Sequence, residues 1–463
     1  MNGRKFVAGN SFLWNRHGDG KPGWSDHSRP PARAVGLAMN PHAITRPEHD
    51  IASTVMQMAE LSLAQVAIFA FPFIFAVVCA RSLGPANYGV VSFYTALTAF
   101  LGMFIEFGFD SIGVREVHAM DRRQAPDQVM WNVTVAKLMV CVATCSVAVP
   151  LLLVTRSSAE ASMSYAMLVY LIAFALDTSW YLRSLELMWS LMFVAAVSRL
   201  AGIVLLISVV SGHNDMAAAM WTYTFVAWAN AVMGWLIMCK LRIVGKPRFE
   251  VAHLRSLLGS GASIVVGNLC GASLTSGGIA LLGVFAHPVL TGAANMALRI
   301  RTAGQATLLP LVQLGFVRLS VRAGSDPAGA VAVGRRFFYL QMACSLAVAL
   351  LIILNADRIV AFAYGLPVAP EPAGVLVRLF AIGIPASVAG SLFGLQCLTL
   401  FKQERAYVLV LLAAAAIFFG LLLLTNAGTS ANYAWALLAA ESWVFLAAGL
   451  HLRGVLLDGL PRI

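Results

Sequence analysis

The chain is a succession of long apolar stretches separated by short polar segments. Runs of about 20 apolar residues, the length of an α-helix that crosses a lipid bilayer, recur about twelve times. The fourth and fifth runs are the least clearly separated, because only a short polar segment divides them. The pattern predicts an all-α integral membrane protein with about 12 transmembrane helices. The runs cover residues 60–80, 88–108, 131–155, 164–183, 191–211, 216–239, 256–284, 294–317, 336–355, 373–398, 406–425 and 430–452.

Composition supports this interpretation independently of the pattern. Hydrophobic residues make up 59% of the chain and charged residues 11%, and the mean hydropathy is +0.79. A water-soluble fold cannot bury so much apolar surface, which excludes the soluble classes. All seven cysteines fall within or at the end of apolar runs. No His or carboxylate joins them at metal-ligand spacing, so we interpret them as packing residues.

Positive charge is distributed unevenly between alternate loops. With the N-terminus inside, the loops predicted to be cytoplasmic hold most of the Lys and Arg, whereas the outer loops hold Arg81, Arg156 and Arg358. Short cytoplasmic loops retain positive charge, so we expect both termini to be cytoplasmic. The net charge of +11 therefore reflects topology and does not indicate a nucleic-acid partner.

Residues 1–50 do not share the apolar pattern. This segment is rich in Gly, Pro, Arg and His. It also lacks the apolar core and small-residue cleavage site of a signal peptide. We expect a disordered tail, with a translation start at Met39 as the alternative.

Two lobes are expected. The basic loop 240–255, interrupted by Pro247, divides the predicted helices six and six. The N-lobe would span 51–245 with helices 1–6, and the C-lobe 246–463 with helices 7–12. Transporters with a six-plus-six arrangement commonly place their binding site between the halves, near the bilayer midplane, and alternate its access. A central cavity between the lobes is expected on that analogy.

A motif at 81–89 joins the first two apolar runs. It reads Arg-Ser-Leu-Gly-Pro-Ala-Asn-Tyr-Gly and is followed by Glu-Phe-Gly-Phe-Asp at 106–110 and by Arg-Glu at 115–116. It resembles the turn between the first two helices of O-antigen flippase-like proteins, the polysaccharide-export branch of the multidrug/oligosaccharidyl-lipid/polysaccharide exporter superfamily. The matching positions are Arg81, Leu83, Gly84, Pro85, Tyr88, Gly89 and Arg115.

The resemblance continues over about residues 55–450. The segment 177–186 is similar to a Trp-containing family segment, with Ser184 where Gly is usual. The segment 293–300 is similar to the entry into the eighth helix, although Asn295 and Met296 replace the expected aromatic residue. Glu441 lies where the family often has a lone Glu in the last helix.

The resemblance implies a function. Such proteins flip undecaprenyl-diphosphate-linked oligosaccharide units across the bacterial inner membrane for surface polysaccharide synthesis. The expected partners are this lipid-linked oligosaccharide, membrane lipids and the polymerase machinery, and no nucleic acid. No cofactor is expected, and transport would be driven by a proton or sodium gradient.

Charged residues inside the predicted helices are the candidate site. An ionised side chain in hydrocarbon is costly, and arginine keeps its proton, so each one needs a cavity or a partner. Because the bases outnumber the carboxylates, we expect a cationic cavity that suits an anionic diphosphate. The bases are Lys137, Arg199, Arg299, Arg301 and Arg378, and the carboxylates, which are also the candidates for ion coupling, are Glu106, Asp177 and Glu441.

Two alternatives stay open for the first half. Lys137 and Arg199 lie a few residues into ascending helices, and Glu106 and Asp177 lie near the cytoplasmic ends of descending helices. The four either pair as a structural cluster or face the cavity.

In the second half, the sequence places only Glu371 near the three arginines. Arg299 and Arg301 are two residues apart, so they point to nearly opposite sides of one helix. We favour Arg299 as the diphosphate ligand, because it follows Asn295 and precedes Thr302 and Gln313 on one side and matches a basic family position. Snorkelling to the outer interface is the alternative for Arg301 and Arg378.

Small and aromatic residues have two interpretations each. The glycines of the seventh run permit close helix packing or a bend at a gate. The aromatic residues Trp180, Trp221, Tyr223 and Trp228 belong to interfacial belts or stack on sugar rings.

Two other functional classes remain. A cation-coupled multidrug antiporter has the same helix count but prefers cationic cargo. A polysaccharide polymerase or ligase usually has a large external loop, whereas the longest one here lies around 357–372. The sequence shows no nucleotide-binding glycine loop, metal cluster or nucleophile constellation, so we expect a transporter that is not an enzyme.

Overall fold

The computed structural model describes residues 51–119, 126–155, 160–248, 250–325, 327–398, 400–401, 403–425 and 429–457. The predicted tail at 1–50 and the alternative start at Met39 lie outside this part of the chain. All the regular elements of the described residues are helices, which confirms the predicted all-α class.

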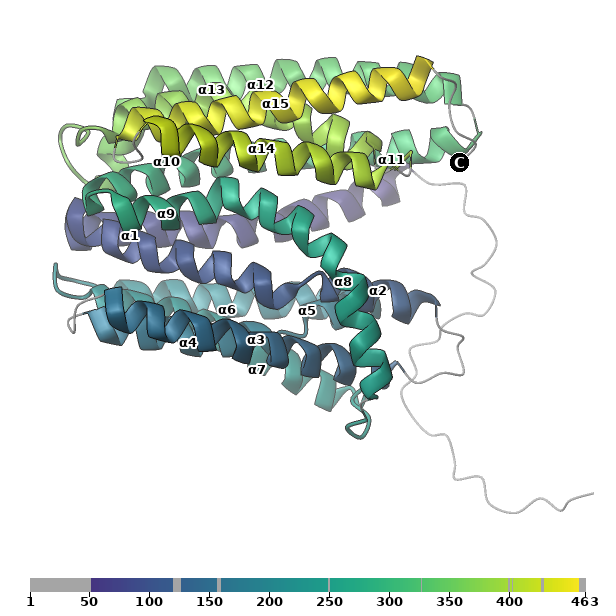
Figure 1. Cartoon of the computed structure of the whole chain (residues 1–463), viewed down its shortest axis with the longest axis horizontal. Coiled ribbons are helices and arrows are strands. Elements are labelled where there is room, and N and C mark those ends of the chain that lie inside the picture. Colours follow the sequence, from purple (N-terminus) through teal and green to yellow (C-terminus); the bar gives the residue numbers. More distant parts are fainter. Residues whose placement is uncertain are drawn as a thin grey trace, which may run out of the picture. The chain divides into compact units, whose positions relative to one another are not determined.

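The helices of the first part of the chain are α1 to α7 (Figure 1). They span Ile51–Glu106 (α1), Phe109–Ala119 (α2), Asp127–Thr155 (α3), Ala161–Ala175 (α4), Ser179–Ser184 (α5), Met188–Val209 (α6) and Met216–Lys240 (α7). The helices that follow are α8 to α15, with two π-helical segments η2 and η3 inserted. They span Val251–Ala272 (α8), Ser273–Gly277 (η2), Gly278–Phe285 (α9), Pro288–Ala306 (α10), Leu309–Ser325 (α11), Pro327–Tyr364 (α12), Ala373–Ser391 (α13), Leu392–Leu398 (η3), Glu404–Thr425 (α14) and Ser430–Leu457 (α15).

Ten stretches of the described chain are long and apolar enough to cross a membrane, fewer than the predicted twelve. Two particulars explain the difference. The predicted runs 60–80 and 88–108 fall into one continuous stretch, Ala70–Ala119. The predicted run 294–317 is helical, but it is divided between α10 and α11 and carries many polar residues.

The motif at 81–89 produces a break within α1. Gly84 has φ 78° and ψ 170°, a conformation that glycine adopts without steric cost, so the helix is interrupted there. Pro85 follows directly, and proline is favoured in the first turn of a helix. The sequence thus encodes two helices joined at Gly84.

Most helices pack within one of two groups. In the first group, α2 to α7, the helix pairs in contact are α4 with α7, α6 with α7, α2 with α5, α3 with α4 and α2 with α3. In the second group, α9 to α15, contacts join α12 to α13, α13 to α15, α14 to α15 and α10 to α13. Helix α8 contacts α2 and α3 as well as α14. The lobe boundary at 245 stays a prediction.

Three tryptophans of α7 fix its register against α4. The indole N–H of Trp221 donates to Oγ of Ser162 at 3.1 Å, and that of Trp228 to the Val169 carbonyl at 3.1 Å. Trp235 donates to the Leu176 carbonyl at 3.0 Å. Donors and acceptors both recur every seven residues in the same direction, so α4 and α7 lie parallel along this contact. We call these three bonds the tryptophan ladder.

The motif at 81–89 contacts elements far along the chain. Arg81 donates to the Phe362 carbonyl from Nε at 3.0 Å and from one Nη at 2.5 Å. Its guanidinium lies 4.4 Å from the centroid of the Phe362 ring. Asn87 donates to the His213 carbonyl at 2.8 Å, and Nδ1 of His213 lies 2.9 Å from the Leu83 carbonyl. The motif therefore joins α1 to the end of α12 and to the segment between α6 and α7.

The segment between α6 and α7 is itself held by Asp215. Backbone N–H groups of Gly212 and Ser211 donate to Oδ2 of Asp215 at 2.8 and 3.0 Å. These bonds favour the ionised carboxylate and hold the pKa of Asp215 below its usual range. The loop that presents His213 to α1 is thereby ordered.

The second half of α1 packs closely against α10. Nδ2 of Asn295 donates to Oη of Tyr88 at 3.2 Å and to Oγ of Ser92 at 3.0 Å, and all three side chains are buried. A Cβ atom at Gly89 would overlap the carbonyl oxygen of Pro288. The two helices meet backbone to backbone at this point.

The glycines of the seventh run allow close helix packing at two positions and accompany a helix irregularity at a third. Gly277 and Gly278 lie against Phe100 and Tyr433 respectively, so they permit close packing. Gly271, in contrast, has open space around it and precedes the π-helical segment η2, an irregularity within the span. A gating role stays a prediction.

We predict that Gly89→Ala destabilises the protein. The added methyl group must displace the Pro288 backbone, and overpacking of this kind costs about 1–3 kcal/mol. Thermal unfolding of the purified protein in detergent measures the change. Gly420→Ala on α14 is the matched control, because nothing lies within 4 Å of the added atom. Equal midpoints for the two variants would contradict the close approach of α1 and α10.

Candidate functional site

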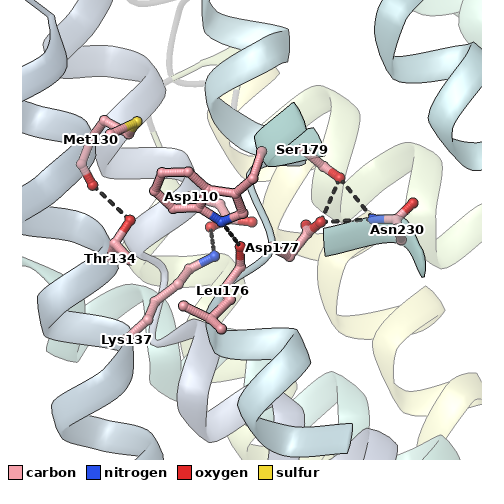
Figure 2. A network of polar contacts seen from close by, with 9 residues as sticks. Asp110, Met130, Thr134, Lys137, Leu176, Asp177, Ser179 and Asn230 are labelled. Atoms are coloured by element: carbon pink, nitrogen blue, oxygen red, sulfur yellow. Dashed lines mark hydrogen bonds and ion pairs between the residues drawn. The ribbon is translucent and has the colours of Figure 1, made fainter. Parts of the chain in front are cut away.

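A polar network in the first helix group contains Lys137 (Figure 2). Lys137 on α3 is 2% exposed and forms an ion pair with Asp110 on α2. One of the two alternatives left open by the sequence paired Lys137 with Glu106 or Asp177, and the ion pair with Asp110 corrects that alternative. One turn earlier on α3, the Thr134 hydroxyl donates to the Met130 carbonyl at 2.8 Å.

Asp177 lies in the same network, at the break between α4 and α5. Its Oδ1 accepts hydrogen bonds from Oγ of Ser179 at 2.8 Å and from Nδ2 of Asn230 at 2.7 Å. Asn230 comes from α7, so the carboxylate joins the α4–α5 turn to that helix. Asp177 therefore has neutral donors, and the predicted pairing of four charged residues is not formed as such.

Glu106 and Arg199 complete this region. Glu106 is the last residue of α1, and the charged groups near it are Asp110, Lys137, Arg183 and Asp177. Arg199 on α6 is half-buried and donates from Nη1 to the Ala195 carbonyl of its own helix at 2.9 Å. No carboxylate of the described residues lies within ion-pair distance of Arg199.

The second helix group contains a buried ion pair between α10 and α15. Nη2 of Arg301 lies 2.5 Å from Oε1 of Glu441, and the side chains are 5% and 11% exposed. From the sequence, we expected Arg301 at the outer interface or in the cavity, without a partner. Burial beside Glu441 corrects the snorkelling alternative for Arg301. The other carboxylate oxygen of Glu441, Oε2, is buried and has no hydrogen-bond partner among the described residues.

Arg378 also has a partner that the sequence did not indicate. It forms an ion pair with Asp357, near the end of α12, and not with Glu371. The side chains are 42% and 58% exposed, so this pair lies at the surface of the described chain. A solvated or interfacial pair of this kind contributes little to stability.

Arg299 differs from the other predicted site residues. It is half-buried on α10, one turn after Asn295 and beside the paired Arg301, and it lies close enough to Tyr88 to interact electrostatically. Within the described residues, Arg299 has neither a hydrogen bond nor an ion pair. Asn295, which we expected on the same side, is bound to Tyr88 and Ser92 of α1.

Charge balance must be revised accordingly. The expected surplus of positive charge counted three intrahelical carboxylates, and the structure adds Asp110 and Asp357 as partners of buried or interfacial bases. The bases inside the helices therefore do not outnumber the carboxylates. The local surplus lies at Arg299 and Arg199, on α10 and α6.

The aromatic residues for which the sequence left interfacial belts or sugar stacking open all contact protein. Trp180 is buried, and Trp221 and Trp228 donate to α4 as described above. The ring of Tyr223 stacks on Tyr170, with centroids 5.1 Å apart and an interplanar angle of 13°. None of these four side chains is free of protein contacts.

A histidine that sequence reasoning missed joins α8 to α2 and α3. Nε2 of His253 lies 2.9 Å from Oε2 of Glu116, and Nδ1 lies 3.2 Å from Nδ2 of Asn132. Oδ1 of Asn132 accepts from the Glu250 backbone N–H at 3.0 Å, which fixes the orientation of the amide. Nδ1 of His253 must then accept, and Nε2 carries the proton donated to Glu116. A carboxylate next to Arg115, within the family motif region, was the only signal in the sequence.

We predict different costs for breaking the two ion pairs of the second group. Glu441→Gln leaves the buried Arg301 without its counter-ion, which costs about 3–5 kcal/mol. Asp357→Asn on the exposed pair costs about 0–1 kcal/mol. Thermal unfolding in detergent compares the variants, and the double variant Arg301→Met/Glu441→Leu should recover part of the loss. Equal midpoints for Glu441→Gln and Asp357→Asn would contradict the burial of the first pair.

Comparison with known proteins adds independent findings. Residues 57–317, more than half of the chain, match the family described as polysaccharide biosynthesis protein. The chain is 23% identical over 337 residues to the "Putative O-antigen transporter" of Escherichia coli strain K12, covering 72% of this chain and 80% of that protein.

Two solved structures are similar in fold. An inward-facing multidrug resistance MATE family transporter of the MOP superfamily has a TM-score of 0.62 at 13% identity, covering 86% of this chain and 99% of that one. The lipid II flippase MurJ in its inward closed conformation has a TM-score of 0.62 at 11% identity, covering 85% and 87%. The resemblance found at residues 81–89 is thereby confirmed: the chain is a multi-pass membrane protein that belongs to the polysaccharide biosynthesis protein family.

Proposed function

We propose that the protein flips undecaprenyl-diphosphate-linked oligosaccharide units across the bacterial inner membrane, for synthesis of a surface polysaccharide. The observation that carries this proposal is Arg299, a half-buried base on α10 for which the described residues supply no partner. An unpaired arginine in a membrane protein calls for an anionic ligand or a wet cavity. A diphosphate supplies the charge-assisted hydrogen bonds that the protein does not.

Arg199 is proposed as a second ligand from the first helix group. Its only described hydrogen bond is to the carbonyl of its own helix, so the guanidinium retains donors for a phosphate. Lys137, Arg301 and Arg378 are assigned a supporting role, because each is engaged by a carboxylate. The sugars occupy the cavity between the lobes, and the lipid tail stays in the bilayer.

The driving force and surroundings belong to the same proposal. Glu106, Asp177 and Glu441 are the groups that would couple flipping to a proton or sodium gradient. Both termini lie in the cytoplasm, and the polymerase machinery receives the flipped unit. The likeness to a lipid II flippase and to an O-antigen transporter supports this substrate class. A surplus base in the membrane disfavours the alternative of a multidrug antiporter with cationic cargo.

We predict that Arg299→Ala abolishes most polymer export. Loss of a charge-assisted contact of about 2 kcal/mol lowers flipping about thirtyfold. The measurement is surface polysaccharide in cells deleted for the gene and complemented with each variant, together with lipid-linked units on the inner face. Arg299→Lys should retain part of the activity, and Arg335→Ala, an exposed arginine at the start of α12, serves as the control.

The result for Arg299 separates the functional classes. Units trapped on the cytoplasmic side support a flippase, whereas units that reach the outer face unpolymerised would assign a polymerase. Normal polymer with altered drug sensitivity would assign a multidrug exporter. Full export by Arg299→Ala would show that this arginine does not bind the diphosphate.

We also predict that linking α1 to α10 arrests transport. Ser92 and Asn295 are hydrogen bonded at 3.0 Å across these helices, so cysteines at both positions should be joined by a short thiol-reactive cross-linker with a reducible spacer, in a background free of the native cysteines. Alternating access requires the contact to open, and cross-linking would therefore stop export while reduction restores it. The single-cysteine variants are the controls. Export that continues with the cross-link formed would mean that this contact stays closed throughout the cycle.

A further inference from the structure

A shallow apolar groove runs along one face of α12 near the end of that helix. Its volume is about 470 Å³, and its lining residues are Leu351, Ile352, Asn355, Arg358, Ile359 and Phe362. They recur every three or four residues, which places them on a single helix face. Leu351 is 63% exposed and Phe362 is 67% exposed, so the groove opens outwards from the protein. In a membrane-spanning helix this side faces lipid.

Polarity changes along the groove in a defined order. Arg358 lies about 9 Å along the axis from Tyr364, the last residue of α12, at a rise of about 1.5 Å per residue. Leu351 lies about 10 Å deeper in the span than Arg358 by the same rise. The charged end is therefore close enough to the helix terminus to reach the membrane surface, and the apolar end points towards the bilayer interior. A glycerophospholipid has the same order of headgroup and chain.

The charged end of the groove has a net positive charge. Asp357, the carboxylate adjacent in sequence to Arg358, is engaged by Arg378. Arg358 itself has no hydrogen bond or ion pair within the described part of the chain. Arg81 adds a second cation, because its guanidinium lies over the Phe362 ring and is held at the Phe362 carbonyl. Arg358 precedes Phe362 by one helical turn, so both cations lie at the same end.

We infer that this groove binds an anionic glycerophospholipid, with its phosphate at Arg358 and Arg81 and one acyl chain along Ile359 and Leu351. Two arginines without a free carboxylate favour a headgroup of net negative charge over a zwitterionic one. The bound lipid would brace the contact between α1 and α12, because Arg81 of α1 is held at Phe362 of α12. This site is separate from Arg299 and does not depend on which cargo the protein carries.

The test is thermal unfolding of the purified full-length protein in detergent, titrated with phosphatidylglycerol or with phosphatidylcholine of the same acyl chains. Phosphatidylglycerol should raise the unfolding midpoint at lower concentration than phosphatidylcholine. Arg358→Ala should raise the half-saturating concentration of phosphatidylglycerol about fivefold. Arg358→Lys should keep the preference, and Arg336→Ala, an exposed arginine at the other end of α12, should leave it unchanged.

Three results would overturn the inference. Equal responses to the two lipids would show that the groove does not select for an anionic headgroup. An equal response to glycerol 3-phosphate would show that the apolar groove takes no part. A response to undecaprenyl phosphate that Arg358→Ala weakens, with no response to phosphatidylglycerol, would assign the groove to a polyprenyl lipid. Loss of polymer export by Arg299→Ala is a separate readout, so either idea can fail without the other.

Discussion

The cost of placing charge in hydrocarbon governs this structure more than any other constraint. Where the described helices carry a base inside the span, a carboxylate from another helix is usually beside it. Lys137 meets Asp110 across α2 and α3, and Arg301 meets Glu441 across α10 and α15. Because a single buried charge is destabilising and a pair is tolerated, these contacts specify which helices are neighbours. Arg299 and Arg199 depart from this rule, which is why their positions suggest function.

Two long elements connect the helix groups. The second half of α1 is bound to α10 through Asn295, and the end of its first half is bound to α12 through Arg81, while α8 is bound to α2 and α3 through His253. Apolar packing accompanies these hydrogen bonds. Residues of α1 share one buried cluster with residues of α10 and α12, and Leu254 and Leu257 of α8 pack in another with residues of α2 and α3. Movement of the helix groups against each other must therefore open apolar contacts as well as hydrogen bonds.

Sequence reasoning recovered the helices because hydropathy is local, and it recovered the family because the turn at 81–89 has a distinctive spacing. It failed where a partner depends on long-range register. Arg301 and Glu441 are 140 residues apart, and nothing in one chain says that their helices touch. Asp110 was overlooked as a partner because it follows a helix break at Phe107, which has a φ of 45°, and so does not continue the face of Glu106. The twelve apolar runs were right in composition, and the motif at 81–89 was correctly placed between the first two. Only the backbone shows that the break falls at Gly84 and that the eighth run is divided.

The tryptophan ladder has a consequence for how the first group can move. A slip of α7 along α4 by one helical turn, about 5.4 Å, would break all three indole hydrogen bonds at once, because donors and acceptors have the same seven-residue spacing. A slip of seven residues would let two indoles find acceptors again and leave the third unbonded. Only the observed register therefore allows all three indoles of the tryptophan ladder to form their hydrogen bonds. Sliding between these helices is therefore disfavoured, because it breaks all three hydrogen bonds together, and we expect α4 and α7 to rotate or tilt as one piece.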